Sequence, residues 1–218
     1  MTCHLLVAHG SPDPRHGAVV RSIAAAVRAR GIDTEAAFLE HDRPRASDRL
    51  VGARGPLTVL GLLLSPGYHA RVDVPRLIEA GPDDVVDRGV LGAGPWLDGA
   101  MDEAVAAVGG DTATPVVVVS AGSTLTAARR NIEDHVTRWG SGRPAATWVV
   151  TDPSDLSVLG EVPAESVVLP FLVAPGIFSD RIGDAADDWG LRTAPVLGVT
   201  EGFIDAVIDR LGASLRVR

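Results

Sequence analysis

The sequence predicts an α/β fold made of two similar halves, each with a mostly parallel four-stranded sheet flanked by helices. Short runs rich in Val and Leu alternate with amphipathic stretches along all 218 residues, which is typical of a doubly wound arrangement. Continuous apolar runs such as Leu57–Leu64 and Val116–Val119 favour parallel strands that are covered on both faces. The motifs of the first half also recur, in the same order, in the second.

The expected strands are runs of apolar residues bounded by Gly, Pro and polar residues, at 4–8, 34–39, 57–64, 86–91, 115–120, 146–151, 166–173 and 192–198. The expected helices have an apolar stripe with helical spacing, at 15–30, 96–108, 124–139, 178–189 and 202–212, with shorter ones at 45–54, 72–80 and 154–160. Gly31 is a suitable end for the first of these helices.

Three pairs of segments reveal the repeat. VAHGSPDPRH at 7–16 aligns with VSAGSTLTAA at 119–128, and VLGLLLSPGYHARVDV at 59–74 aligns with VLPFLVAPGIFSDRIG at 168–183. VLGAGPWLDGAMDEAV at 90–105 aligns with VLGVTEGFIDAVIDRL at 196–211. Because the three matches are collinear, they indicate one internal duplication rather than an array of short repeats. We expect two domains, 1–112 and 113–218, that meet near Gly109–Thr114.

Composition excludes several classes of function. The net charge is −8 and aromatic residues make up 4%, which disfavours binding of nucleic acid. The single cysteine, Cys3, allows no disulfide within the chain and no multi-cysteine zinc site. The apolar runs are too short to span a bilayer, and no basic leader precedes the first strand, so we expect a cytoplasmic protein with no membrane partner.

Charge is unevenly distributed between the two halves. The first 80 residues contain ten arginines and eight acidic residues, whereas residues 81–218 contain ten arginines and twenty acidic residues. The first part therefore carries a balance of +2 and the second a balance of −10, which together give the net charge of −8. An anionic ligand is expected to prefer the first half.

Two histidines and a glutamate stand where parallel strands end. His9 follows the first expected strand, Glu40 closes the second, and His69 follows the third through a short loop. Ligands of open parallel sheets bind at the carboxyl ends of the strands, so these side chains can converge on one cleft. Two imidazoles and a carboxylate suit a divalent transition metal.

The second half serves as an internal control for these histidines. Ala121 aligns with His9 and Phe178 aligns with His69, although the small residues around them are kept. Histidines that served the fold would be needed in both halves, so the pair points to function. His4 is expected to be structural and His135 to lie on the surface. His16 and His41 are expected to be solvent-exposed, with a place lining the cleft as the alternative for either.

The segments LLVAHGSPDPRHGAVV, AAFLEHDRP and LLLSPGYHARVDVP resemble the three signature segments of the sirohydrochlorin chelatases, the class II tetrapyrrole chelatases of sirohaem and cobalamin biosynthesis. The long members of that family are also internally duplicated, so the resemblance covers both halves. It implies two tandem Rossmann-like subdomains of the chelatase type, with the active site in 1–112 and a degenerate site in 113–218. It also implies that His9 and His69 bind the incoming metal and that Glu40 contributes to the site.

The activity implied is that of a lyase that inserts a divalent metal, Fe²⁺ first and Co²⁺ next, with Ni²⁺ also possible, into an anionic metal-free tetrapyrrole. The metal is then a substrate, and no cofactor is bound permanently. We expect His9 to bind metal and accept a proton, His69 to be the second ligand, and Glu40 to be a ligand or proton relay. Substrate-binding candidates are the HGS loop, the loop before the second histidine and nearby arginines: Gly10, Ser11, Arg15, Arg43, Leu64, Ser65, Pro66, Gly67, Tyr68 and Arg71.

Two other functions remain open. A non-catalytic carrier of tetrapyrrole or metal would keep the cleft without turnover. A histidine phosphatase would use a histidine near the first strand, but it needs an arginine beside that histidine to hold phosphate, and Ala8 precedes His9. The chain is expected to be a monomer or a homodimer.

Overall fold

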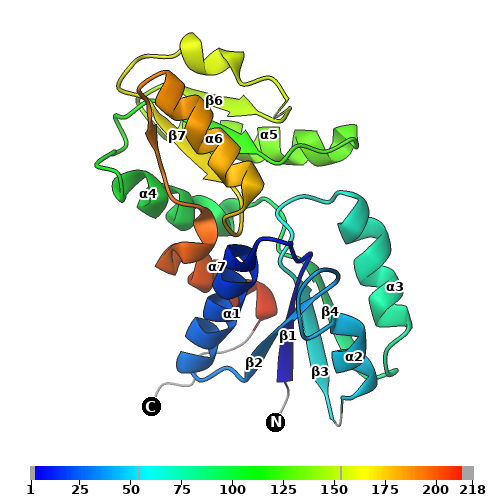
Figure 1. The fold of residues 1–218 in the computed structure, drawn as a ribbon. Coiled ribbons are helices and arrows are strands. Elements are labelled where there is room, and N and C mark those ends of the chain that lie inside the picture. The colour runs from blue at the N-terminus through cyan, green and yellow to red at the C-terminus, as the bar shows by residue number, and fades with distance from the viewer. Residues whose placement is uncertain (1–2, 54, 153, 213–218) are drawn as a thin grey trace. The chain divides into compact units, whose positions relative to one another are not determined.

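The computed structural model describes residues 3–53, 55–152 and 154–212. The chain folds into two compact units, one formed by Met1–Gly92 with Ile204–Arg218 and the other by Ala93–Phe203. Each unit holds a parallel four-stranded sheet flanked by helices, which confirms the predicted fold class (Figure 1). No helix in the described ranges is long and apolar enough to cross a membrane.

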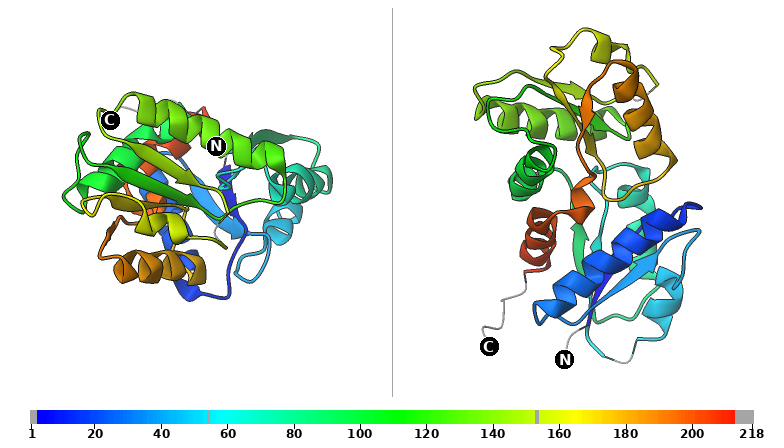
Figure 2. Two further views of the ribbon diagram at one scale, coloured as in Figure 1. Left: turned by 90° about the horizontal axis from the view of Figure 1, so that it is seen from above. Right: turned by 60° about the vertical axis from the view of Figure 1, so that its left-hand side comes forward.

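The sheet of the first unit has the strand order β2-β1-β3-β4, and all neighbours are parallel. Its strands are β1 (Cys3–Ala8), β2 (Thr34–Phe38), β3 (Leu57–Gly61) and β4 (Val85–Val90). Its helices are α1 (Pro14–Ala29), α2 (Ala46–Val51), α3 (Val74–Glu79) and α7 (Glu201–Leu211). Helices α2 and α3 cover one face of the sheet, while α1 and α7 lie together on the other (Figures 1 and 2).

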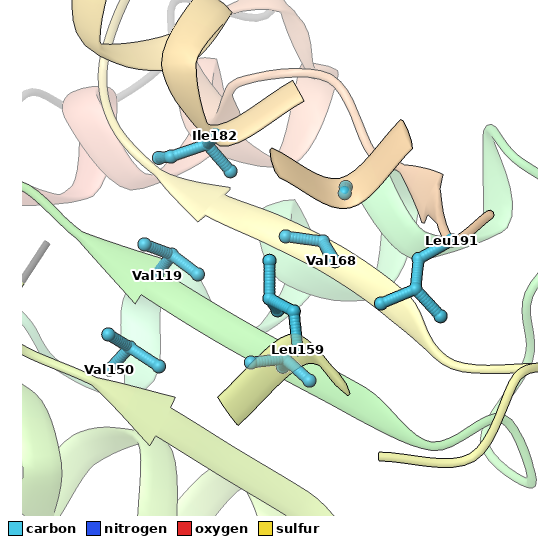
Figure 3. Close-up of a cluster of buried hydrophobic side chains, with 8 residues drawn as sticks. Val119, Val150, Leu159, Val168, Ile182 and Leu191 are labelled. Carbon is cyan, nitrogen blue, oxygen red and sulfur yellow. The ribbon is translucent and has the colours of Figure 1, made fainter. Parts of the chain in front are cut away.

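The sheet of the second unit repeats this order as β6-β5-β7-β8. Its strands are β5 (Val116–Ser120), β6 (Thr147–Val150), β7 (Val167–Phe171) and β8 (Arg192–Thr193). Its helices are α4 (Asp98–Ala106), α5 (Thr126–Ser141) and α6 (Ile177–Asp188). One face of this sheet carries a buried apolar cluster in which Val119, Val168 and Ile182 contribute from β5, β7 and α6 (Figure 3).

The two halves exchange their last helices. Helix α4 follows the first sheet in the sequence, yet it belongs to the second unit, where it contacts β7. Helix α7 follows the second sheet, yet from Ile204 onward it belongs to the first unit, where Arg210 donates a hydrogen bond to the carbonyl oxygen of Val90. The compact units therefore differ in extent from the sequence repeats at 1–112 and 113–218, and those bounds remain a prediction about the duplication.

Several expected elements are shorter in the structure than in the prediction. The strand expected at 192–198 is short and spans Arg192–Thr193 as β8; Leu197–Val199 then form a 3₁₀ turn, η4. The helix expected at 154–160 is the single 3₁₀ turn η3 (Ser157–Gly160). The strand expected at 57–64 ends at Gly61, beside a register shift between β3 and β4.

His135 is buried, which corrects the expectation that it lies on the surface. Its residue is 4% exposed, and it lies on the apolar face of α5. The guanidinium of Arg138 donates to Nδ1 of His135 at 2.9 Å and also binds the carboxylate of Asp98 at 2.7 and 2.9 Å. Burial lowers the pKa of His135 to about 4, because the effect of burial is larger than the opposite effect of the nearby Asp98 carboxylate.

The burial of His135 predicts a loss of stability in mild acid. Below the unfolded pKa of about 6.5, the unfolded chain takes up a proton that the folded chain does not, so stability falls as pH decreases from there toward 4. At pH 5 this residue alone is expected to cost about 2 kcal/mol relative to pH 7. Urea unfolding measures the free energy of unfolding at both pH values. The difference between pH 7 and pH 5 should be about 2 kcal/mol smaller in His135→Gln than in the wild type.

His41→Gln is the matched control, since His41 is exposed on a loop and the substitution leaves His135 in place. That variant should keep the pH dependence of the wild type. If His135→Gln loses as much stability between pH 7 and pH 5 as the wild type does, buried His135 is not the cause of the pH dependence.

Candidate metal site at the strand ends

Parallel register brings the ends of β1, β2 and β3 to one edge of the first sheet. Ala8 pairs with Phe38 and Val7 pairs with Gly61, so the three strands end level with one another. Backbone pairing continues past β1 and β2, since the N–H of Glu40 donates to the carbonyl oxygen of His9 at 2.8 Å. The residues that follow these strands are therefore held close together.

The structure brings His9 and His69 together at this edge. Their ring centroids lie 4.2 Å apart, with an angle of 63° between the ring planes. A third imidazole, that of His41, has its centroid 6.2 Å from that of His9. The roles of His9 and His69 as metal ligands remain a prediction, which their proximity supports.

Both histidines have their Nδ1 atoms engaged. Nδ1 of His9 lies 2.9 Å from the carbonyl oxygen of Gly10, and Nδ1 of His69 lies 2.5 Å from a carboxylate oxygen of Asp73. A carbonyl and an ionised carboxylate only accept hydrogen bonds, so each Nδ1 carries the proton. In the neutral state each ring then keeps its lone pair on Nε2, the atom that can bind a metal or accept a proton.

Glu40 is placed differently from the two histidines. Its carboxylate lies 3.5 Å from Nε2 of His41, and its side chain is 57% exposed. Among the described residues, no three His, Cys, Asp or Glu side chains are grouped so that they could hold a metal ion. In the described ranges the Glu40 carboxylate is paired with His41 and not with the imidazole of His9 or His69, so its role as ligand or proton relay stays a prediction.

Gly10 lets the HGS loop pass close to the turn after β2. Its φ is +95°, and a Cβ at this position would lie 1.9 Å from the carbonyl oxygen of Glu40. The facing turn is itself tight, since His41 has a φ of 59° and the N–H of Asp42 donates to Glu40 at 2.6 Å. A side chain at position 10 would therefore push apart the two loops that carry His9 and Glu40.

We expect Gly10→Ala to lower the free energy of unfolding by about 3 kcal/mol or more, because backbone strain and a steric clash add together. Gly31→Ala is the control, since Gly31 also has a positive φ, +86°, but open space around it. That change should cost only about 1 kcal/mol. Thermal unfolding of the two variants separates these effects; equal losses would show that the contact with Glu40 is unimportant.

The predicted substrate-binding arginines are already engaged. The guanidinium of Arg15 binds the carboxylate of Asp13, the N-cap of α1, at 2.6 Å, and these hydrogen bonds lower the pKa of Asp13. Arg43 is 79% exposed, with Nη1 3.6 Å from Asp48. Nε of Arg71 donates to the carbonyl oxygen of Pro66 at 2.9 Å and so braces the loop before His69. Their binding of substrate remains a prediction.

The side chains of the two loops around the histidines differ in solvent exposure. Ser11 caps the HGS loop by accepting a hydrogen bond from the N–H of Asp13 at 3.1 Å. In the second loop Leu64 is buried and Ser65, Pro66 and Gly67 are partly buried. Tyr68 is 58% exposed, and its ring stands nearly perpendicular to that of His69 at 5.8 Å. Tyr68 thus offers an aromatic surface beside the histidine pair.

Sequence reasoning missed two features near the site. The helix expected at 72–80 begins earlier, as a π-helical turn η1 (His69–Asp73) that runs into α3, and such turns are frequent at functional sites. His16 is half-buried rather than exposed, and its Nδ1 has no hydrogen-bond partner in the part of the chain that the structure describes. Burial lowers the pKa of His16; Asp42 opposes this shift and His9 adds to it.

The matching positions of the second half hold no such chemistry. Ala121 is exposed, and Phe178 packs against the buried cluster that contains Ile182. An aromatic side chain packed on a core cannot take the place of an imidazole with a free lone pair. The second half thus lacks the histidine pair of the first.

A hollow of about 240 Å³ lies at the opposite ends of the first sheet's strands, near Cys3, Leu57 and Arg49. It includes none of the strand-end histidines. Burial raises the pKa of the Cys3 thiol, so this cysteine is not activated as a nucleophile. We therefore place the candidate site at the carboxyl ends of the strands.

Comparison with known proteins points to one family. Residues 3–108 match the family model CbiX. No curated protein sequence matches the chain.

Among solved structures, the chain is similar to the sirohydrochlorin chelatase SirB from Bacillus subtilis subspecies spizizenii in complex with cobalt, with a TM-score of 0.79, 18% identity and coverage of 97% of this chain and 94% of that one. For SirB from Bacillus subtilis with Fe³⁺ the TM-score is 0.80 and the identity 16%, over 99% and 96% of the two chains. For CbiX, the terminal enzyme for biosynthesis of sirohaem in denitrifying bacteria, the TM-score is 0.74 and the identity 19%, over 97% and 99%. Residues 3–108 thus match the CbiX family model, and the fold of the chain is that of the SirB and CbiX structures.

Proposed function

We propose that the chain is a sirohydrochlorin chelatase, a lyase that inserts a divalent metal into a metal-free tetrapyrrole. The observation that carries the proposal is the pair His9 and His69, whose ring centroids lie 4.2 Å apart; each Nδ1–H donates a hydrogen bond to an oxygen, which leaves a lone pair on each Nε2. The CbiX match over residues 3–108 supports it, as do the similar structures that hold cobalt and Fe³⁺. Fe²⁺ is the proposed substrate metal, with Co²⁺ next.

The two lone pairs account for the proton balance of the reaction. A metal-free tetrapyrrole loses two N–H protons when it binds a divalent ion. His9 and His69 first bind the ion through Nε2; once the ion passes to the four pyrrole nitrogens, each freed Nε2 accepts one proton and later releases it to water. No permanently bound cofactor is needed for this sequence.

The site is proposed to lie wholly in residues 1–112, with 113–218 as a degenerate half. We propose that the protein acts in the cytoplasm, as a monomer or homodimer, with one active site per chain. The balance of +2 over the first 80 residues favours the carboxylates of an anionic tetrapyrrole on this side.

The direct test is to mix the protein with sirohydrochlorin and Fe²⁺, Co²⁺ or Ni²⁺ and to follow the absorption change of the tetrapyrrole. We expect wild-type protein to exceed the uncatalysed rate with many turnovers per chain. His9→Ala and His69→Ala should each lower kcat/KM by at least about 100-fold, because each removes a ligand and proton acceptor.

Phe178→Leu is the matched control, since it changes the position that corresponds to His69 and keeps its apolar character. Its activity should stay within a few-fold of wild type. Less than one product per chain would favour a non-catalytic carrier, and no acceleration with any of the three metals would rule out the enzyme.

Tyr68 provides a test of substrate binding. Because its exposed ring lies beside His69, we expect it to pack against the flat macrocycle. Tyr68→Ala should raise the KM for the tetrapyrrole by about tenfold and leave kcat nearly unchanged, whereas Tyr68→Phe should resemble wild type. Steady-state kinetics at saturating metal measure this split; an unchanged KM in Tyr68→Ala would show that the ring does not touch the substrate.

A further inference from the structure

We propose that Asp73 is a positioning residue that holds His69 in the tautomer with its proton on Nδ1, so that Nε2 faces the metal with a lone pair. The catalytic part of this inference rests on the proposed function, whereas the tautomer itself does not. Asp73 was not among the candidates that the sequence suggested. It does lie in the segment LLLSPGYHARVDVP that carries the family resemblance, and its spacing of four residues after His69 places both side chains on one helical face.

The contact between the two side chains is direct. A carboxylate oxygen of Asp73 lies 2.5 Å from Nδ1 of His69, and the two side chains are 32% and 43% exposed. Histidines that bind metals commonly donate their second ring N–H to a carboxylate in this manner, which orients the ring and makes the ligand nitrogen more basic. Asp73 therefore stands where such a partner is needed.

A capping role does not explain the residue. Asp73 immediately precedes α3, but its φ and ψ are helical, −75° and −43°, and its side chain makes no capping hydrogen bond. The arginine two residues earlier, Arg71, is directed to the carbonyl oxygen of Pro66 rather than to this carboxylate. The hydrogen bond that the structure gives to the Asp73 carboxylate goes to the imidazole.

The second half offers an internal comparison. The repeat that aligns His69 with Phe178 also aligns Asp73 with Ile182, four residues further on. There the polar pair is replaced by an apolar one, in which Phe178 packs against the buried cluster that contains Ile182. The loop before the pair is kept as Pro175 and Gly176. His69 and Asp73 are thus both replaced in the second half, as expected of two residues that act as a pair.

The loss of Asp73 has a specific consequence. Without an acceptor at Nδ1, the proton of neutral His69 can move to Nε2 and occupy the lone pair that the metal needs. We expect Asp73→Leu, which has a similar shape and no acceptor, to weaken binding of Co²⁺ by 10- to 100-fold. Asp73→Asn keeps an acceptor oxygen without the charge and should restore most of the affinity.

The experiment uses the full chain labelled with ¹⁵N at histidine. In metal-free wild-type protein at pH 8, the ring spectrum of His69 should show a protonated Nδ1 and an unprotonated Nε2. Asp73→Leu should shift His69 toward a mixture of tautomers, and Asp73→Asn should return it toward wild type. Glu79→Gln, which removes a charge from the exposed end of α3, should change neither the tautomer nor the affinity for Co²⁺.

The outcomes separate this inference from the proposed function. An unchanged tautomer and unchanged Co²⁺ affinity in Asp73→Leu overturn the inference, whatever the activity. The predicted shifts in a protein that inserts no metal support the inference and reject the chelatase activity. If Asp73→Leu does not fold, Asp73→Ala takes its place with the same two readouts and the same decision.

Discussion

The parallel pairing of β1 with both β2 and β3 is the constraint on which the candidate site depends. Because the three strands end level with one another, the residues that follow them meet at one edge of the sheet. The hydrogen bond from the N–H of Glu40 to the carbonyl oxygen of His9 then joins the first two loops, and Gly10 permits their close approach. The third loop, in which Arg71 donates a hydrogen bond to the carbonyl oxygen of Pro66, places His69 beside His9. A change of register in any of these strands would separate the two imidazoles.

Within that framework, chemistry is set by what each Nδ1 contacts. A backbone oxygen and a carboxylate oxygen accept hydrogen bonds from the Nδ1–H groups of the two histidines, and this leaves both Nε2 atoms able to act as ligands. The second half has the same sheet order but packs Phe178 against a buried cluster at the corresponding place. The duplication thus separates what the fold requires, namely the strands and the Gly-containing loops, from what the site requires. We propose that the histidine and the aspartate belong to the second group.

The fold class, most of the strands and helices, and the proximity of His9 and His69 could be predicted from the sequence, because apolar periodicity marks the strands and parallel topology gathers their ends. The exchange of α4 and α7 could not, since an amphipathic pattern shows that a helix has an apolar face but not which sheet covers it. The burial of His135 depends on a hydrogen bond from Arg138 and on packing near Phe171, which periodicity does not reveal. Asp73 lies in the segment that carries the family resemblance but was given no role, because a spacing of four residues does not show that its carboxylate contacts Nδ1 of His69.

The central claim is that the first half alone holds one metal ion through two imidazoles. X-ray absorption at the cobalt edge of the Co²⁺-loaded full chain, with titration of bound metal, tests it most directly. The account predicts one Co²⁺ per chain with scattering from two histidine rings, falling to one ring in His69→Ala. Two ions per chain, or a cobalt environment without imidazole that His69→Ala leaves unchanged, would contradict it.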